Sequence, residues 1–260
     1  MKLKGILHFA VSYICIMLDN LLKFIFPKRC VICDTVLPYG DKLYNMHLCD
    51  ECKNNIEFIK EPTCKKCGAM IDMYDEAYCS RCKEKLRTNF EYGFGLCRYN
   101  DFVKESLHRI KYVGRKEYIE FYGKCIAKVY KDKFLKINPD CFIPVPIHRK
   151  RLIKRNYNQA KVLANAISDE LAKNGIDIPV DNSIIKRVKN TKVLNKLGDD
   201  ERKNELQNAF TVYNTEGINT VVLVDDIYTT GETIDNISKI LRQNGINKVF
   251  FVVISVLDNL

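Results

Sequence analysis

Two adjacent carboxylates and a group of hydroxyl side chains stand together near the end of the sequence. Asp225 and Asp226 follow an apolar run, and Thr229, Thr230 and Thr233 surround a single glycine directly afterwards. Hydroxyl and backbone N–H donors bind a phosphate, and glycine permits its close approach. Carboxylate oxygens accept hydrogen bonds from sugar hydroxyls or bind magnesium. Phosphate, diol and metal together describe a ribose 5-phosphate; the alternative is an ordinary surface turn with two solvated aspartates.

The elements around these residues are a buried strand and a helix. Residues 221–224 are an unbroken apolar run, which is typical of a parallel strand covered on both faces. Ile234, Ile237 and Leu241 recur at helical spacing until a glycine at 245. In open α/β sheets, ligands bind at the carboxyl ends of strands. The sequence therefore predicts an α/β fold with a parallel, Rossmann-like sheet and a site at residues 225–233.

Eight of the twelve cysteines form four C-x-x-C pairs in the first third of the chain. Within each half of this region, 15 and then 11 residues separate two pairs, as in four-cysteine zinc sites. Disulfides are the alternative, which the lack of an evident secretory segment disfavours. The spacing leaves open whether pairs join sequentially or crosswise. We expect two structural zinc ions, bound by Cys30, Cys33, Cys49, Cys52, Cys64, Cys67, Cys79 and Cys82.

Positive charge is concentrated in the middle of the chain. The formal net charge is +10, and residues 101–160 contain 15 lysines and arginines against 6 acidic residues. Five of the seven residues from 149 to 155 are basic, and they follow a short apolar strand, residues 140–147, that two prolines interrupt. This concentration indicates an anionic partner such as pyrophosphate, a nucleotide or nucleic acid. A solvated basic face is the alternative.

The stretch V-V-L-V-D-D-I-Y-T-T-G-E-T, residues 221–233, resembles the signature of the type I phosphoribosyltransferases. The resemblance implies a magnesium-dependent site for phosphoribosyl pyrophosphate. Asp225 and Asp226 would contact the ribose hydroxyls at the catalytic centre. The 5-phosphate would bind to Tyr228, Thr229, Thr230, Gly231, Glu232 and Thr233.

Two further segments narrow the resemblance to the ComF family. P-V-P-I-H-R-K-R-L-I-K-R-N-Y-N-Q-A, from residue 144, and L-H-R-I-K-Y-V-G, from residue 107, are similar to elements of that family, as is the cysteine layout, and the similarity runs from about residue 21 to 257. It implies a pyrophosphate loop containing Pro146, His148, Arg149, Arg151 and Arg155. The charged segment 189–208 is expected to be a lid. Arg187, Thr191 and Arg202, in and beside this segment, match residues of the family pattern. Leu194 and Glu205 depart from the usual glutamine and asparagine, and Asn156 replaces a glycine.

The resemblance implies a phosphoribosyltransferase-like protein that acts in DNA uptake on the cytoplasmic side. One alternative is a regulatory or single-stranded DNA-binding competence factor without transferase activity, because tyrosines at 112, 118, 122 and 157 lie among the basic residues. Another is a phosphoribosyltransferase of nucleotide salvage. Other DNA-uptake proteins are the expected partners.

Three parts are expected along the chain. Residues 1–27 form an amphipathic helix whose low-charge run, residues 5–18, is shorter than the roughly 20 residues of a membrane span, while peripheral membrane contact stays open. Residues 28–87 form a double zinc ribbon, and residues 88–260 form the phosphoribosyltransferase-like domain. Within that domain we expect a strand or hairpin at 88–99, strands at 181–188 and 248–256, and helices at 101–114 and 115–135.

Overall fold

The computed structural model describes residues 13, 17, 21–22, 24–38, 47–72, 76–85, 88–189 and 209–257. By internal contacts the chain divides into two compact units, residues 1–55 and 56–260. The sequence suggests one cysteine-rich segment ending at residue 87, whereas the contacts assign the second four-cysteine cluster to the same unit as the sheet. The three expected parts stay a prediction.

The unit of residues 1–55 contains the first cysteine cluster and the short helix α3 (Asp50–Asn55). Towards its beginning, the described residues Tyr13, Met17, Leu21 and Leu22 are helical and exposed. The other residues of the expected amphipathic helix before residue 21 lie outside the described ranges. Among the helices that the structure describes, none combines the length and the apolar character needed to cross a bilayer.

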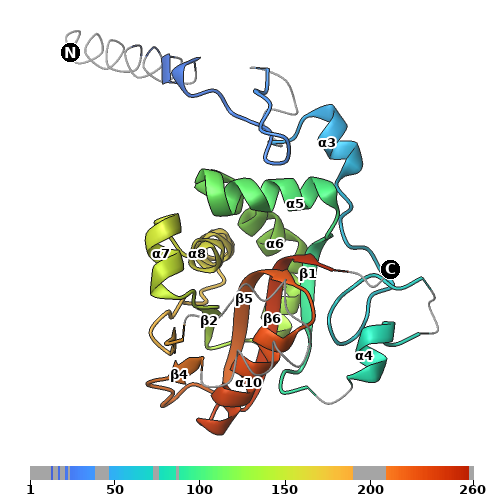
Figure 1. Cartoon of the computed structure of the whole chain (residues 1–260), viewed down its shortest axis with the longest axis vertical. Helices are drawn as coiled ribbons and strands as arrows, with labels where there is room; N and C mark the ends of the chain where they lie inside the picture. The colour runs from blue at the N-terminus through green and yellow to red at the C-terminus, as the bar shows by residue number, and fades with distance from the viewer. Residues whose placement is uncertain are drawn as a thin grey trace, which may run out of the picture. The chain divides into compact units, whose positions relative to one another are not determined.

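A four-stranded parallel sheet forms the centre of the unit of residues 56–260. Its strands are β1 (Gly93–Arg98), β2 (Cys141–Pro144), β5 (Thr220–Tyr228) and β6 (Lys248–Val256), in the order β1-β6-β5-β2. The apolar run in β5 is completely buried, and β6 runs parallel beside it (Figure 1). The predicted α/β class with a parallel, Rossmann-like sheet is therefore confirmed.

Helices cover both faces of the sheet. On one face, Val221 and Leu223 of β5 belong to a core cluster with Ile234 and Ile237 of α10 (Glu232–Gln243). Alternate residues of a strand point to opposite faces. On the other face, Phe142, the register partner of Val222, packs against α6 (Lys116–Ile137), which contacts α8 (Gln159–Ala172).

Two elements differ from the sequence-based expectation. The predicted helix 101–114 is α5 (Asp101–His108) followed by a π-helical turn, η1 (Arg109–Val113), which ends at Gly114 with φ +81°. The predicted strand at 181–188 is only three residues long, β3 (Ile185–Arg187). It pairs antiparallel with β4 (Phe210–Val212), outside the parallel sheet.

Candidate functional site

The acidic pair lies within the last part of β5, which is longer than its apolar run. Pro144 ends β2 opposite Val224, but β5 continues to Tyr228, and among the described residues β6 is its only strand neighbour there. Beyond Val224, no described strand lies on the side of β5 that β2 occupies, and we call this the open side of β5. The two carboxylates belong to this part of the strand. Asp226 is 7% exposed, and Asp225 is partly exposed.

Lys111 of η1 is the counter-ion of this pair. Its ammonium forms an ion pair with Asp226 Oδ2, and both side chains are largely buried. The contact places a positive charge directly beside the acidic pair. The π-helical turn places Lys111 here, and such turns are frequent at functional sites. The segment 107–114 carries part of the family resemblance, but no local pattern in the sequence assigns Lys111 a role.

The two carboxyl groups have opposite pKa shifts. Burial, together with the charge of Asp226, raises the pKa of Asp225 well above its usual value. Burial would also raise the pKa of Asp226, but the ammonium of Lys111 outweighs it and lowers that pKa. The unliganded site therefore favours one ionised carboxylate paired with one lysine.

The loop after β5 presents the N-terminus of α10. Gly231, with φ +82°, is the N-cap residue, and it has no side chain to accept from the first N–H groups of the helix, which lack intrahelical acceptors. A Cβ at this glycine would meet the Tyr228 hydroxyl. The Tyr228 ring itself stacks on Phe251 in the core, with centroids 4.7 Å apart. A ligand contact from Tyr228 would therefore use its backbone.

One hydroxyl group and one carboxylate of this loop already have partners. The Thr230 hydroxyl donates to Glu232 Oε2, and Glu232 Oε1 lies 2.9 Å from Lys85 Nζ. Thr229 and Thr233 are partly exposed.

The basic segment is a short helix, α7 (Arg149–Arg155), where the sequence suggests a loop. His148 begins it, because its Nδ1 accepts a hydrogen bond from the Lys150 N–H at 3.2 Å. The helix consists of five Arg and Lys residues, one Leu and one Ile, and most of these residue types have high helix propensity. It ends at Asn156, whose left-handed φ of 62° suits asparagine in a position where glycine is usual.

The basic helix approaches the acidic pair through Arg155. Its charge contributes to the lowered pKa of Asp226, and its guanidinium lies 5.3 Å from the Tyr112 ring centroid. Burial and the positive charge of the nearby Arg155 lower the pKa of Arg151, which means that the two guanidinium groups repel each other. An anion between them would relieve that repulsion. Arg149 is exposed, whereas Pro146 and His148 are partly buried.

The tyrosines of the basic region divide between core and surface. Tyr118 and Tyr122 are buried in α6, and Tyr157 donates its hydroxyl hydrogen to the Ile110 carbonyl. Tyr112 is 57% exposed. Of the four tyrosines expected among the basic residues, Tyr112 is therefore the one whose ring is exposed enough to contact a ligand at the surface.

The lid lies largely outside the described residues. Thr191 and Arg202, together with Leu194 and Glu205, fall there. Arg187 is described, and its guanidinium lies over the Phe210 ring at 5.3 Å.

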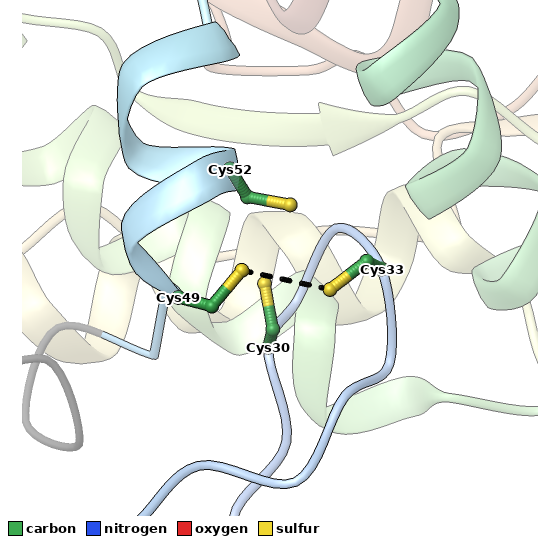
Figure 2. Close-up of side chains that lie close together, drawn as sticks. All are labelled: Cys30, Cys33, Cys49 and Cys52. Atoms are coloured by element: carbon green, nitrogen blue, oxygen red, sulfur yellow. Dashed lines mark hydrogen bonds between the residues drawn. The ribbon is translucent and has the colours of Figure 1, made fainter.

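The eight paired cysteines form two clusters, in which the pairs join sequentially. Cys30, Cys33, Cys49 and Cys52 converge in the first cluster, and Figure 2 shows their side chains. Cys64, Cys67, Cys79 and Cys82 form the second. Every cysteine in the described ranges is a free thiol, so no disulfide joins them.

The sulfur geometry suits zinc. In each cluster the four Sγ atoms lie within 4.8 Å of one another. The Cys33–Cys49 and Cys67–Cys79 sulfur distances are both 3.7 Å. Zn–S bonds of about 2.3 Å in a tetrahedron place the sulfurs about 3.8 Å apart. Two zinc ions therefore fit, one in each cluster, and the closed ligand sets indicate structural sites.

Sequence comparisons agree with the class that these features define, an α/β protein with a double zinc ribbon. A family model described as "Double zinc ribbon domain" matches residues 21–83. Competence protein F of Haemophilus influenzae is 40% identical over 43% of this chain and 48% of the relative, so the chain spans about half that protein's length.

Two other relatives match more of the chain. Competence protein ComFC of Bacillus subtilis is 28% identical over 76% of this chain and 79% of the relative. DNA utilization protein YhgH of Salmonella typhi is 26% identical over 64% of this chain and 72% of the relative. The chain is therefore similar to a double zinc ribbon over residues 21–83 and, over larger parts of its length, to proteins named for competence and DNA utilization.

Proposed function

We propose that this chain binds phosphoribosyl pyrophosphate with magnesium at residues 225–233 and acts in DNA uptake on the cytoplasmic side. The names of the relatives, competence proteins and a DNA utilization protein, support the role in DNA uptake. The observation that carries the ligand is the apposition of three groups at the open side of β5. These are the acidic pair, the uncapped start of α10, and Arg155 of α7.

Each group has one task in this proposal. Asp225 and Asp226 accept hydrogen bonds from the ribose hydroxyls, while Lys111 keeps Asp226 ionised. The first N–H groups of α10 bind the 5-phosphate. Arg151 and Arg155 stabilise the charge that develops on pyrophosphate as its bond to ribose C1 breaks and an acceptor bonds to C1.

Magnesium fits the donor set in this proposal. The acidic pair supplies carboxylate oxygens, which magnesium prefers as ligands; because Lys111 contacts Asp226 Oδ2, the other oxygens of the pair would hold the ion. When bound together with the ligand, the ion would neutralise part of the pyrophosphate charge. The same site without transfer would make the chain a phosphoribosyl pyrophosphate sensor rather than an enzyme.

Calorimetric titration of the full chain with phosphoribosyl pyrophosphate and magnesium tests the ligand. We expect Asp225→Asn and Asp226→Asn each to weaken binding about tenfold or more, because each replaces a carboxyl group that accepts ribose hydrogen bonds or binds magnesium with a neutral amide. Asp169→Asn on the exposed side of α8 is the matched control and should bind as the unchanged chain does. Equal affinity in all four proteins would contradict the ribose assignment.

A second candidate function is single-stranded DNA binding at η1 and α7. The favouring observation is the exposed Tyr112 ring, which lies beside His108 and under the Arg155 guanidinium. An exposed aromatic ring among arginines suits base stacking and phosphate contact. The relative named as a DNA utilization protein is consistent with this candidate.

Fluorescence anisotropy with a labelled oligothymidylate tests it. We expect Tyr112→Ala to weaken binding roughly fivefold or more, since stacking contributes about 1–3 kcal/mol per base. Tyr213→Ala, at another exposed tyrosine, should leave binding unchanged. Affinity should also fall steeply with salt. If Tyr112→Ala and Tyr213→Ala behave alike, this surface does not stack bases.

A further inference from the structure

We propose that Arg81 and Lys85 of the second zinc ribbon are positioning residues for the phosphate-binding loop, residues 228–233. The inference rests on the proposed function of that loop. Neither residue belongs to the acidic pair, to the basic helix or to the cysteine ligands. Both act on the loop from a part of the chain about 150 residues earlier.

Arg81 holds the backbone of the loop. It lies in α4 (Ser80–Glu84), between the zinc-cluster residues Cys79 and Cys82. Its Nη1 donates to the Thr229 carbonyl and, at 3.1 Å, to the Leu257 carbonyl. One guanidinium therefore joins the start of the loop to the end of β6.

The contact with Thr229 also orients the next N–H group. In a planar trans peptide, the C=O and the N–H point in opposite directions. Because the Thr229 carbonyl faces Arg81, the Thr230 N–H faces away from the ribbon. A donor that faces away from Arg81 stays available to an anion in the loop.

Lys85 and Asn89 hold two acidic side chains of the first turn of α10, Glu232 and Asp235. Lys85 Nζ lies 2.9 Å from Glu232 Oε1, and the Glu232 carboxylate is largely buried. The Asn89 backbone N–H donates to Asp235 Oδ1 at 2.6 Å, and its side-chain amide contacts both carboxylate oxygens. These contacts pair the Glu232 carboxylate with a cation and hydrogen-bond the Asp235 carboxylate, which lowers the repulsion between these two groups and a phosphate at the start of α10.

The ribbon is packed firmly enough to act as a support. A Cβ on Gly68, in the first knuckle of the cluster, would lie 2.7 Å from the Phe94 Cα and 2.8 Å from the Gly93 carbonyl oxygen. The Gly93 N–H donates to the Lys66 carbonyl at 2.9 Å. Cys64, Cys67 and Cys82 belong to the same core cluster as Tyr228 and the face of α10. The first cluster has Asp34 where the second has Gly68, each with positive φ, which shows that the second knuckle alone requires the small residue for close packing.

Metal binding would set the position of Arg81, because the residues on both sides of it in the knuckle are the ligands Cys79 and Cys82. Zinc supplies the fixed tetrahedral geometry that holds the two thiolates. The ribbon thus orients the loop without touching the ligand itself, as supporting residues orient the ligand-binding residues of other sites.

Hydrogen exchange of the zinc-loaded full chain, without ligand, tests the inference. We expect Arg81→Ala to speed exchange about tenfold in peptides covering residues 228–235, because a charged hydrogen bond restrains that loop. Arg81→Lys keeps a cation and should restore part of the protection. Lys83→Ala is the matched control, because this residue is in the same helix and pairs with Glu76, 2.7 Å away, within the ribbon. Zinc content is measured in each variant and should be equal.

A second readout separates the positioning role from the proposed ligand. Arg81→Ala should also weaken phosphoribosyl pyrophosphate binding about tenfold, and Arg81→Lys should weaken it less. Equal exchange in Arg81→Ala and Lys83→Ala overturns the inference even if the ligand binds. Faster exchange in Arg81→Ala supports the positioning role even if the unchanged chain does not bind this ligand, a result that would instead overturn the proposed function.

Discussion

Asp226→Asn is expected to destabilise the unit of residues 56–260 by about 3 kcal/mol at neutral pH, because it leaves the buried Lys111 ammonium without its counter-charge. Asp225→Asn is expected to stabilise the same unit by about 1 kcal/mol. It removes a carboxyl group whose ionisation is opposed by burial and by the charge of Asp226. Adjacent and chemically identical substitutions should therefore have effects of opposite sign.

The pH dependence follows from the direction of each pKa shift. The pKa of Asp226 is lowered on folding, so its contribution is present above the ordinary aspartate pKa of about 3.9 and is lost as the pH falls. The pKa of Asp225 is raised on folding, so stability is lost as the pH rises from about 4 through its folded-state value. Both substitutions should therefore differ most from the unchanged chain near neutral pH and converge with it in acid.

Urea unfolding followed by far-ultraviolet circular dichroism measures these differences between pH 2 and pH 8. Asp169→Asn, an exposed aspartate on α8, should change stability by no more than about 0.5 kcal/mol. Adding Lys111→Met to Asp226→Asn should recover part of the loss, because the unpaired cation is removed. Shifts of the same sign for both aspartates would contradict the assignment of Lys111 to Asp226.

Loss of the second zinc site is expected to have the larger effect on the sheet. Cys49 and Cys79 are matched residues: each precedes a short helix in its cluster and each is partly buried. We expect Cys49→Ser and Cys79→Ser each to reduce bound zinc by about one ion per chain. Only Cys79→Ser should lower the stability of the unit of residues 56–260, by several kcal/mol, because its cluster packs into the core of that unit.

Metal analysis by mass spectrometry gives the zinc content, and hydrogen exchange resolved along the chain gives the stability of each unit separately. Protection in β5 and β6 should fall in Cys79→Ser and stay unchanged in Cys49→Ser. Equal loss of protection in both variants would mean that the two clusters support the sheet alike.

Local sequence determined several features of this protein. The apolar run of β5, the spacing of apolar residues in α10 and the glycine between them predict a strand, a loop and a helix, and these are present. The C-x-x-C pairs predict two four-thiol sites, and the sulfur positions fit them. Each feature depends on residues close together in the chain, where periodicity and spacing carry the information.

Tertiary structure decided how the parts meet. Spacing did not reveal that the cysteine pairs join sequentially, and the run of basic residues did not show that α7 is a helix begun by His148. Lys111 and Asp226 are 115 positions apart, and the hydrogen bond from Arg81 to Thr229 spans 148 positions. Such partners come into contact because a π-helical turn and a zinc knuckle both pack near one end of β5. No local pattern encodes that packing, because its free energy arises only when the sheet has brought distant segments together.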